Sequence, residues 1–133
     1  CKDLDHIQLV TDSMRAAGMS EGPSVLGSRK YDFRVIVEDG IAKMPDRSCF
    51  AGSVATADRM IRVMVQKAGL DMWQAVRLMT RNPAKLLGIY GRTGSISPGK
   101  AADLLVFDEE VNIEKVYVDG CEVHGNTEQK GDL

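Results

Sequence analysis

The first third of the chain has strand-like hydrophobic patterning. Residues 6–11 are mostly apolar and Asp12 follows at once, which predicts a short strand buried on both faces, as in a parallel sheet. Residues 13–27 are rich in glycine and predict a long loop, and long ordered loops often carry function. Alternation over 31–37, a Glu-Asp-Gly turn and a return over 41–44 predict a β-hairpin.

After the hairpin, the hydrophobic residues recur with the period of a helix. Apolar residues recur at steps of three and four over 57–68, which predicts an amphipathic helix. Ser53 is the expected N-terminal cap and Gly69 the expected end.

A second and a third helix follow in the same pattern. Asp71 and Gln74 have capping-box spacing ahead of an apolar stripe over 72–79. Pro83 can open a short third helix that ends at Gly88. The methionines on these faces are expected to pack in the core.

The last third returns to strands. Residues 103–107, 111–118 and 121–124 are strand-like, and Asp119-Gly120 predicts a tight hairpin turn between the last two. The polar residues that follow are expected to fray.

Composition and charge narrow the class of protein. The chain has 133 residues, of which 44% are hydrophobic and 27% charged, as in globular domains. A net charge of −2 gives no reason to expect nucleic acid or an anionic membrane as partner. No apolar run is long enough to cross a bilayer. The three cysteines lack a CxxC pattern, which favours reduced thiols and a cytoplasmic location.

Asp12 is the sharpest candidate for chemistry. It stands at the end of the predicted buried strand and opens the long loop, where α/β barrels place catalytic groups. A carboxylate there suits a general base or a metal ligand. The structural alternative is that Asp12 only caps the following turn.

The segment Phe50-Ala51-Gly52-Ser53 is the second candidate. Small residues ahead of a helix leave backbone N–H groups open to a polar or anionic ligand, although an ordinary capped helix start uses the same residues. Arg15 could meet a phosphate or carboxylate, or stay a solvated loop residue.

Histidine patterning gives no metal site. His6 lies inside the first predicted strand and His124 lies in the last one, and no HxH or HExxH pattern is present. We therefore expect structural roles for both.

Several motifs occur in an order that points to one family. Residues 9–22 read Leu-Val-Thr-Asp-Ser-Met-Arg-Ala-Ala-Gly-Met-Ser-Glu-Gly, 51–53 read Ala-Gly-Ser, 82–84 read Asn-Pro-Ala, and 94–104 contain Pro-Gly-Lys-Ala-Ala-Asp-Leu. This order resembles the amidohydrolase superfamily and, through residues 9–22, its N-acetylglucosamine-6-phosphate deacetylases. Residues 47–50, Arg-Ser-Cys-Phe, depart from the more usual Asp-Gly-Thr-Leu.

The resemblance implies an α/β fold and the C-terminal third of a longer protein. Residues 1–92 would be the C-terminal part of a metal-dependent (β/α)₈ barrel, 93–124 the returning strands of a small β-sandwich domain, and 125–133 a polar tail. A whole barrel needs about 250 residues, so this chain is expected to be a piece. Its opening on Cys1 rather than Met agrees with that expectation.

The resemblance also implies a reaction. The full-length parent would hydrolyse the acetamide of N-acetylglucosamine 6-phosphate to glucosamine 6-phosphate and acetate, and this chain would be inactive by itself. Asp12 would be the catalytic residue, and backbone groups of Phe50, Ala51 and Gly52 would help bind the substrate. A divalent metal, zinc or similar, would be the cofactor in the parent, with its ligands absent from this chain.

Partners and alternatives follow from the same resemblance. The expected partners are a small-molecule amino-sugar phosphate and the remainder of the barrel, in a homo-oligomeric parent. N-acetylgalactosamine-6-phosphate deacetylase or another amidohydrolase is the alternative enzyme. A non-enzymatic β-rich interaction module is the alternative of a different class, against which the Thr-Asp motif at 11–12 argues.

Overall fold

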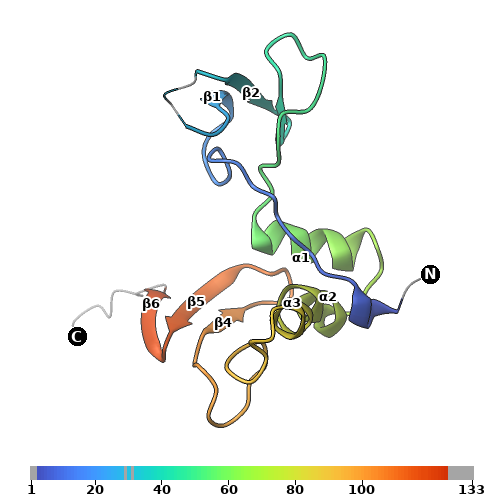
Figure 1. The fold of residues 1–133 in the computed structure, drawn as a ribbon, viewed down its shortest axis with the longest axis vertical. Coiled ribbons are helices and arrows are strands. Elements are labelled where there is room, and N and C mark those ends of the chain that lie inside the picture. The colour runs from blue at the N-terminus through green and yellow to red at the C-terminus, as the bar shows by residue number, and fades with distance from the viewer. Residues whose placement is uncertain (1–2, 29, 31, 126–133) are drawn as a thin grey trace, which may run out of the picture. The chain divides into compact units, whose positions relative to one another are not determined.

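The computed structural model describes residues 3–28, 30 and 32–125. These residues form two three-stranded antiparallel sheets, ordered β1-β2-β3 and β4-β5-β6, and three α-helices (Figure 1). The chain divides into two compact units. We name Val10–Met60 the hairpin unit, and Cys1–Leu9 with Ile61–Leu133 the helix–sheet unit. Of the expected tail, only residue 125 lies within the described residues.

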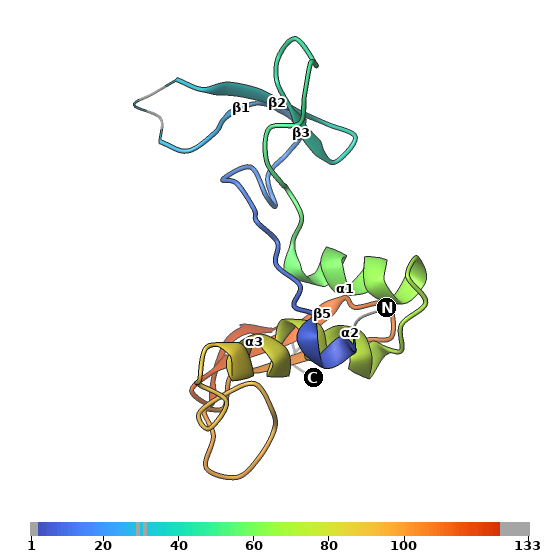
Figure 2. The ribbon, with the colours of Figure 1, turned by 45° about the vertical axis from the view of Figure 1, so that its right-hand side comes forward.

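The hairpin unit is built on one antiparallel sheet (Figure 2). Its strands are β1 (Gly22–Val25), β2 (Arg34–Glu38) and β3 (Ile41–Lys43). The predicted hairpin is confirmed, and its Asp39-Gly40 turn has positive φ at both residues, 54° and 66°, as a type I′ turn requires. The prediction of a continuous loop over 13–27 is wrong, because β1 pairs along β2.

A small core lies against this sheet. Val37 and Ala42 are buried opposite one another on β2 and β3, and Ala16 packs with them. Met14 and Val54 cover the cluster. The loop that carries Asp12 and the segment after Gly52 are therefore anchored on the same apolar patch.

The predicted strand over 6–11 is wrong. Leu4–His6 form a 3₁₀ turn, and the residues after it belong to no strand of the described part of the chain. A buried parallel strand needs a neighbour on each side, and the described residues supply none here. Val10 is accordingly 71% exposed instead of buried.

The helices lie close to their predicted ranges. They are α1 (Ala57–Gln66), α2 (Met72–Met79) and α3 (Arg81–Leu86). The expectation that Ser53 caps the first helix is wrong, because the helix begins four residues later and the Ser53 hydroxyl accepts the N–H of Ala55 at 3.0 Å.

The expectation that Pro83 opens the third helix is wrong, because α3 begins at Arg81. The capping box and the two glycine ends are confirmed. The backbone N–H of Asp71 donates to Oε1 of Gln74 at 3.0 Å, as in a capping box. Gly69 and Gly88 follow the ends of α1 and α3 with φ of 71°, which is typical of helix C-termini.

The helix–sheet unit has its own apolar core. Ile61, Ala75 and Val111 are buried together. Six partly buried residues pack around them: Met64, Val65, Met72, Val76, Met79 and Phe107. The core role predicted for these methionines is confirmed.

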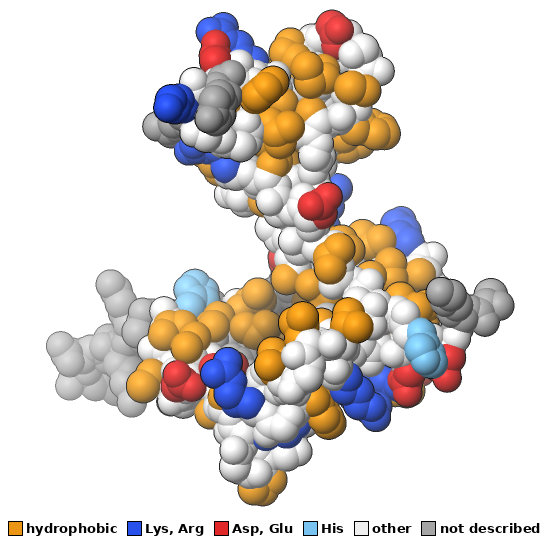
Figure 3. Space-filling model, in the orientation of Figure 1, with side chains coloured by type: hydrophobic (Ala, Val, Ile, Leu, Met, Phe, Trp, Pro, Cys, Tyr) orange, Lys and Arg blue, Asp and Glu red, His pale blue; other side chains and the backbone are white. Residues whose placement is uncertain are grey.

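The three predicted C-terminal strands are confirmed, and they form one antiparallel sheet. They are β4 (Leu104–Phe107), β5 (Ile113–Val118) and β6 (Cys121–Gly125). Many apolar side chains lie on the visible surface (Figure 3), and Ile96 is 88% exposed. No helix among the described residues is long and apolar enough to cross a membrane.

Asn82 fixes the start of the helix–sheet unit. It is buried, and its Nδ2 donates to the carbonyls of Leu4 and Ile7 at 2.7 and 2.8 Å. Arg77 forms an ion pair with Asp5 in the same region. The Asn of the Asn-Pro-Ala motif is thus a structural residue, because it satisfies two carbonyls that no strand pairs.

Gly94 is required by a close approach, and its replacement by Ala is expected to destabilise the protein. A Cβ at this position would lie 2.6 Å from Cβ of Ala84 and 3.1 Å from the carbonyl oxygen of Thr80, and φ is 88°. Overpacking and left-handed strain together predict a loss of about 2–4 kcal/mol in the free energy of unfolding, measurable by urea denaturation. Gly99→Ala is the matched control, because φ is 84° there but nothing lies within 4 Å. Equal losses in the two variants would contradict the packing argument.

Candidate functional site

Two segments that are distant in the sequence lie side by side in the hairpin unit. The N–H of Met14 donates to the carbonyl of Ser53 at 2.9 Å, and the Ser13 hydroxyl donates to the carbonyl of Ala55. Ser13 and Ser53 form an isolated parallel bridge. Asp12 precedes Ser13 and Gly52 precedes Ser53, so these bonds bring Asp12 and Gly52 close together.

Asp12 and Gly52 line one open hollow of about 450 Å³. Its other lining residues are Ser13, Met14, Arg15, Leu26 and Gly27. The structure therefore joins the two strongest candidates from the sequence into one site, which we name the Asp12 hollow. The sequence pattern does not single out Ser13, Met14, Leu26 or Gly27 as site residues, although Ser13 and Met14 stand in the motif at 9–22.

The Asp12 carboxylate is available for chemistry. Its side chain has no hydrogen bond or ion pair with any other described residue and is exposed. Its φ is 47°, in the left-handed region that Asp and Asn tolerate best among residues with a side chain. The alternative that Asp12 only caps the following turn has no hydrogen bond among the described residues to support it.

The segment from Phe50 to Gly52 contributes unequally to the hollow. Phe50 and Ala51 are not among the residues that line it. The Phe50 side chain is 76% exposed, while Ala51 is buried and its N–H donates to the carbonyl of Ala42 at 2.9 Å. Gly52 has a φ of 98°, so its backbone conformation favours glycine.

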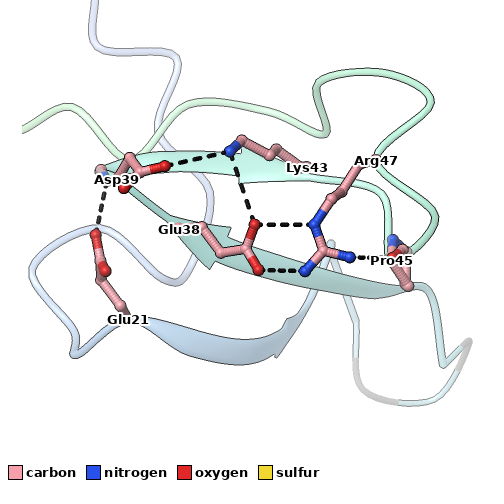
Figure 4. A network of polar contacts seen from close by, with 7 residues as sticks. Glu21, Glu38, Asp39, Lys43, Pro45 and Arg47 are labelled. Carbon is pink, nitrogen blue, oxygen red and sulfur yellow. Dashed lines mark hydrogen bonds and ion pairs between the residues drawn. The ribbon is translucent and has the colours of Figure 1, made fainter.

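A polar network holds the loop that leads into this segment (Figure 4). Arg47 donates from Nη2 and Nε to the two carboxylate oxygens of Glu38 at 2.5 and 3.1 Å, and from Nη1 to the carbonyl of Pro45 at 3.3 Å. Nζ of Lys43 lies 3.7 Å from Oε2 of Glu38. In the turn next to Glu38, the N–H of Gly40 donates to Oε1 of Glu21 at 2.7 Å.

The ion pair between Glu38 and Arg47 predicts that the effect of replacing Glu38 on stability depends on pH. The hydrogen bond from Arg47 lowers the pKa of Glu38, so the stabilisation is present above the pKa of the unfolded state and is lost as the pH falls through the folded-state value. Glu38→Gln should lower Tm at pH 7, and the difference from wild type should shrink as the pH falls below about 4 and through the lowered folded-state pKa of Glu38. Asp39→Asn is the control, because Asp39 is exposed and its carboxylate forms an ion pair with Lys43 alone among the described residues, at 3.6 Å. A Tm difference that persists unchanged at low pH would contradict the electrostatic reason.

The described residues do not form a metal site. No three His, Cys, Asp or Glu side chains among them come close enough together to hold a metal ion. His6 and His124 are both exposed, and His124 is far from Asp12 in the sequence. The described residues of this chain therefore cannot hold a metal ion by themselves.

The Pro-Gly-Lys motif has a structural role. Nζ of Lys100 donates to the hydroxyl of Ser95 at 2.7 Å and to the carbonyl of Tyr90, and it lies 3.6 Å from the centre of the Tyr90 ring. A hydrogen bond with Ser95 and the charge of Lys100 lower the pKa of Tyr90. The lysine thus ties together the loop between α3 and β4.

The match to known proteins covers most of the chain. The model of the amidohydrolase family matches residues 9–123. The chain belongs to the amidohydrolase family. The N-acetylgalactosamine-6-phosphate deacetylase of Escherichia coli O157:H7 is 30% identical over 120 residues, which are 90% of this chain and 30% of that protein.

Solved amidohydrolases of the same kind share the fold of this chain. The N-acetylglucosamine-6-phosphate deacetylase of Thermotoga maritima superposes with a TM-score of 0.80 at 30% identity, over 93% of this chain and 32% of that one. A mutant of the deacetylase from Mycobacterium smegmatis, in complex with N-acetyl-D-glucosamine-6-phosphate, gives a TM-score of 0.78 at 31% identity over 90% of this chain and 31% of its own. The chain therefore spans less than a third of these amidohydrolases.

Proposed function

We propose that the full-length protein to which this chain belongs hydrolyses the acetamide of N-acetylglucosamine 6-phosphate. The observation that carries the proposal is the position of Asp12 and Gly52 on one hollow in a chain of the amidohydrolase family. The likeness to deacetylases that act on this sugar phosphate supports the choice of substrate.

Asp12 would move the protons of the reaction. Its exposed carboxylate accepts a proton from the water that attacks the acetamide carbonyl. It then delivers that proton to the nitrogen as the C–N bond breaks, which gives glucosamine 6-phosphate and acetate. A single carboxylate can serve both steps because the first leaves it protonated for the second.

Backbone groups next to Asp12 would hold the sugar phosphate. Gly52 lines the Asp12 hollow directly. The N–H of Ala51 already donates to Ala42, so the carbonyl is the group of Ala51 that remains for a ligand. Phe50 would contribute through its backbone or through its exposed side chain.

The rest of the site would come from outside this chain. The family implies a divalent metal, zinc or similar, and its ligands would lie in the remainder of the protein. We propose that residues 1–92 complete a (β/α)₈ barrel there and that 93–124 belong to a small β-sandwich domain. The remainder of the barrel would cover Val10, which is 71% exposed in this chain. We further propose a cytoplasmic homo-oligomer.

Acetate release by the full-length protein tests the proposal. We expect kcat/KM for N-acetylglucosamine 6-phosphate to exceed that for the galactosamine epimer. The opposite preference would establish the second candidate, N-acetylgalactosamine-6-phosphate deacetylase, which the Escherichia coli relative favours. Release of acetate from neither sugar, with the metal loaded, would overturn the proposal in favour of another amidohydrolase or a non-enzymatic module.

A further inference from the structure

Ser13 is the side chain that ties the segment of Asp12 to the segment ahead of α1. Its hydroxyl donates to the carbonyl of Ala55, 42 positions further along the chain. The neighbouring bond, from the N–H of Met14 to the carbonyl of Ser53 at 2.9 Å, joins backbone to backbone. The hydroxyl of Ser13 is therefore the part of this connection that depends on residue type.

The acceptor of the Ser13 hydroxyl is itself held in place. The N–H of Ala55 donates to Oγ of Ser53 at 3.0 Å, which closes a short turn. The next carbonyl, that of Thr56, accepts the N–H of Met60 and so begins the hydrogen bonding of α1. The carbonyl of Ala55 lies one residue before this ladder, so it is free to accept the Ser13 hydroxyl.

The direction of Asp12 depends on the residues that follow it. Its φ of 47° is a conformation that a residue with a side chain keeps only where its surroundings hold it. Val10 and Thr11, on its N-terminal side, make no backbone hydrogen bond to any other described residue. The Asp12 carboxylate has no hydrogen-bond or ion-pair partner among those residues either. The bonds of Ser13 and Met14 therefore set where Asp12 points.

We propose that Ser13 is the positioning residue of Asp12, an inference that rests on the proposed function. By fixing the backbone directly after Asp12, the hydroxyl aims the carboxylate at the water and the acetamide nitrogen between which it carries the proton. A small misplacement of a reacting group lowers the rate, while affinity is kept where binding uses other contacts. Loss of the Ser13 hydroxyl thus acts on kcat, and it acts through Asp12.

Three substitutions in the full-length protein test the role of the hydroxyl. Ser13→Ala should lower kcat by about 10- to 100-fold and leave KM close to that of the wild type. Ser13→Val should lose as much. Ser13→Thr has the shape of Ser13→Val but keeps a hydroxyl, so it should keep more than half of the wild-type kcat. Ser13 is exposed, so none of these changes enters the core.

Ser48→Ala is the matched control. The Ser48 hydroxyl donates to Oδ1 of Asp46 at 2.7 Å, and the N–H of Ser48 donates to the same oxygen at 3.0 Å. The control removes a serine hydrogen bond from a residue that does not line the Asp12 hollow, and kcat should stay normal. Normal kcat in Ser13→Ala, or equal losses in Ser13→Thr and Ser13→Val, would overturn the proposal.

A double variant separates positioning from a general effect on the structure. Adding Ser13→Ala to Asp12→Asn should lower kcat no further, because the group that Ser13 directs has already lost its chemistry. A general structural effect would instead multiply the two losses. A second loss as large as that of Ser13→Ala alone would therefore overturn the role of Ser13.

Crystal structures of the full-length wild type and of Ser13→Ala keep this inference separate from the proposed function. The Asp12 carboxylate should point in one direction in the wild type, and it should shift or take several directions in Ser13→Ala. An unchanged carboxylate would overturn the role of Ser13. A wild type that releases no acetate, together with this shift in the variant, would overturn the proposed reaction alone.

Discussion

Asp12→Asn in the full-length protein should lower kcat by about 10²–10⁴-fold while leaving the substrate Kd close to that of wild type. The amide cannot accept the proton of the attacking water, and it cannot return one to the departing amine. One residue serves both steps, so we expect the loss at the upper end of this range. Binding should survive, because the backbone contacts proposed for Gly52 do not depend on the carboxylate.

The substitution is conformationally conservative. Asp12 has a φ of 47°, and Asn tolerates the left-handed region at least as well as Asp. Asp119→Asn is the matched control, because φ is 48° there and the residue lies in the turn between β5 and β6. The control should keep normal kcat and Kd.

The measurement is kcat and Kd for both variants, with metal content determined alongside. An Asp12→Asn protein that keeps more than half of normal kcat would remove Asp12 from the mechanism. Loss of bound metal together with activity would assign Asp12 as a ligand instead of a proton carrier.

The 133-residue chain by itself should release no acetate from N-acetylglucosamine 6-phosphate. Asp12 is present, but no three potential ligands among the described residues come together to hold a metal, and hydrolytic water needs activation to react at neutral pH. The chain also spans only 32% of the Thermotoga maritima deacetylase that it resembles. We therefore expect the isolated chain to release no more acetate than a buffer blank.

The assay compares the purified chain with the full-length protein at equal concentration, each with and without added zinc. The Asp12→Asn version of the chain is the control for contaminating activity. Zinc-dependent acetate release that the chain shows and its Asp12→Asn version lacks would contradict this prediction.

Local signals predicted much of the fold. The Asp39-Gly40 turn, the capping box at Asp71 and the glycine after α1 were all found where the sequence placed them. Each depends on residues a few positions apart, because turn geometry and helix ends are set by neighbouring backbone groups. The three C-terminal strands follow for the same reason, since they are joined by short connections.

Elements that need distant partners were not predicted correctly. The apolar run over 6–11 does not form a strand, because no neighbouring strand of the described chain pairs with it. Conversely, β1 forms in a stretch predicted as loop because β2 offers it a free edge. Ser53 has good capping chemistry, but its carbonyl and hydroxyl are bound to Met14 and Ala55.

For the candidate site, too, the local sequence and the tertiary structure decided different things. By itself, the sequence determined its components, since the Thr-Asp motif and Ala-Gly-Ser each stand out by residue type and order. Only the tertiary structure decided that Asp12 and Gly52 share a hollow, because hydrogen bonds from Ser13 and Met14 to a segment far along the chain bring them together.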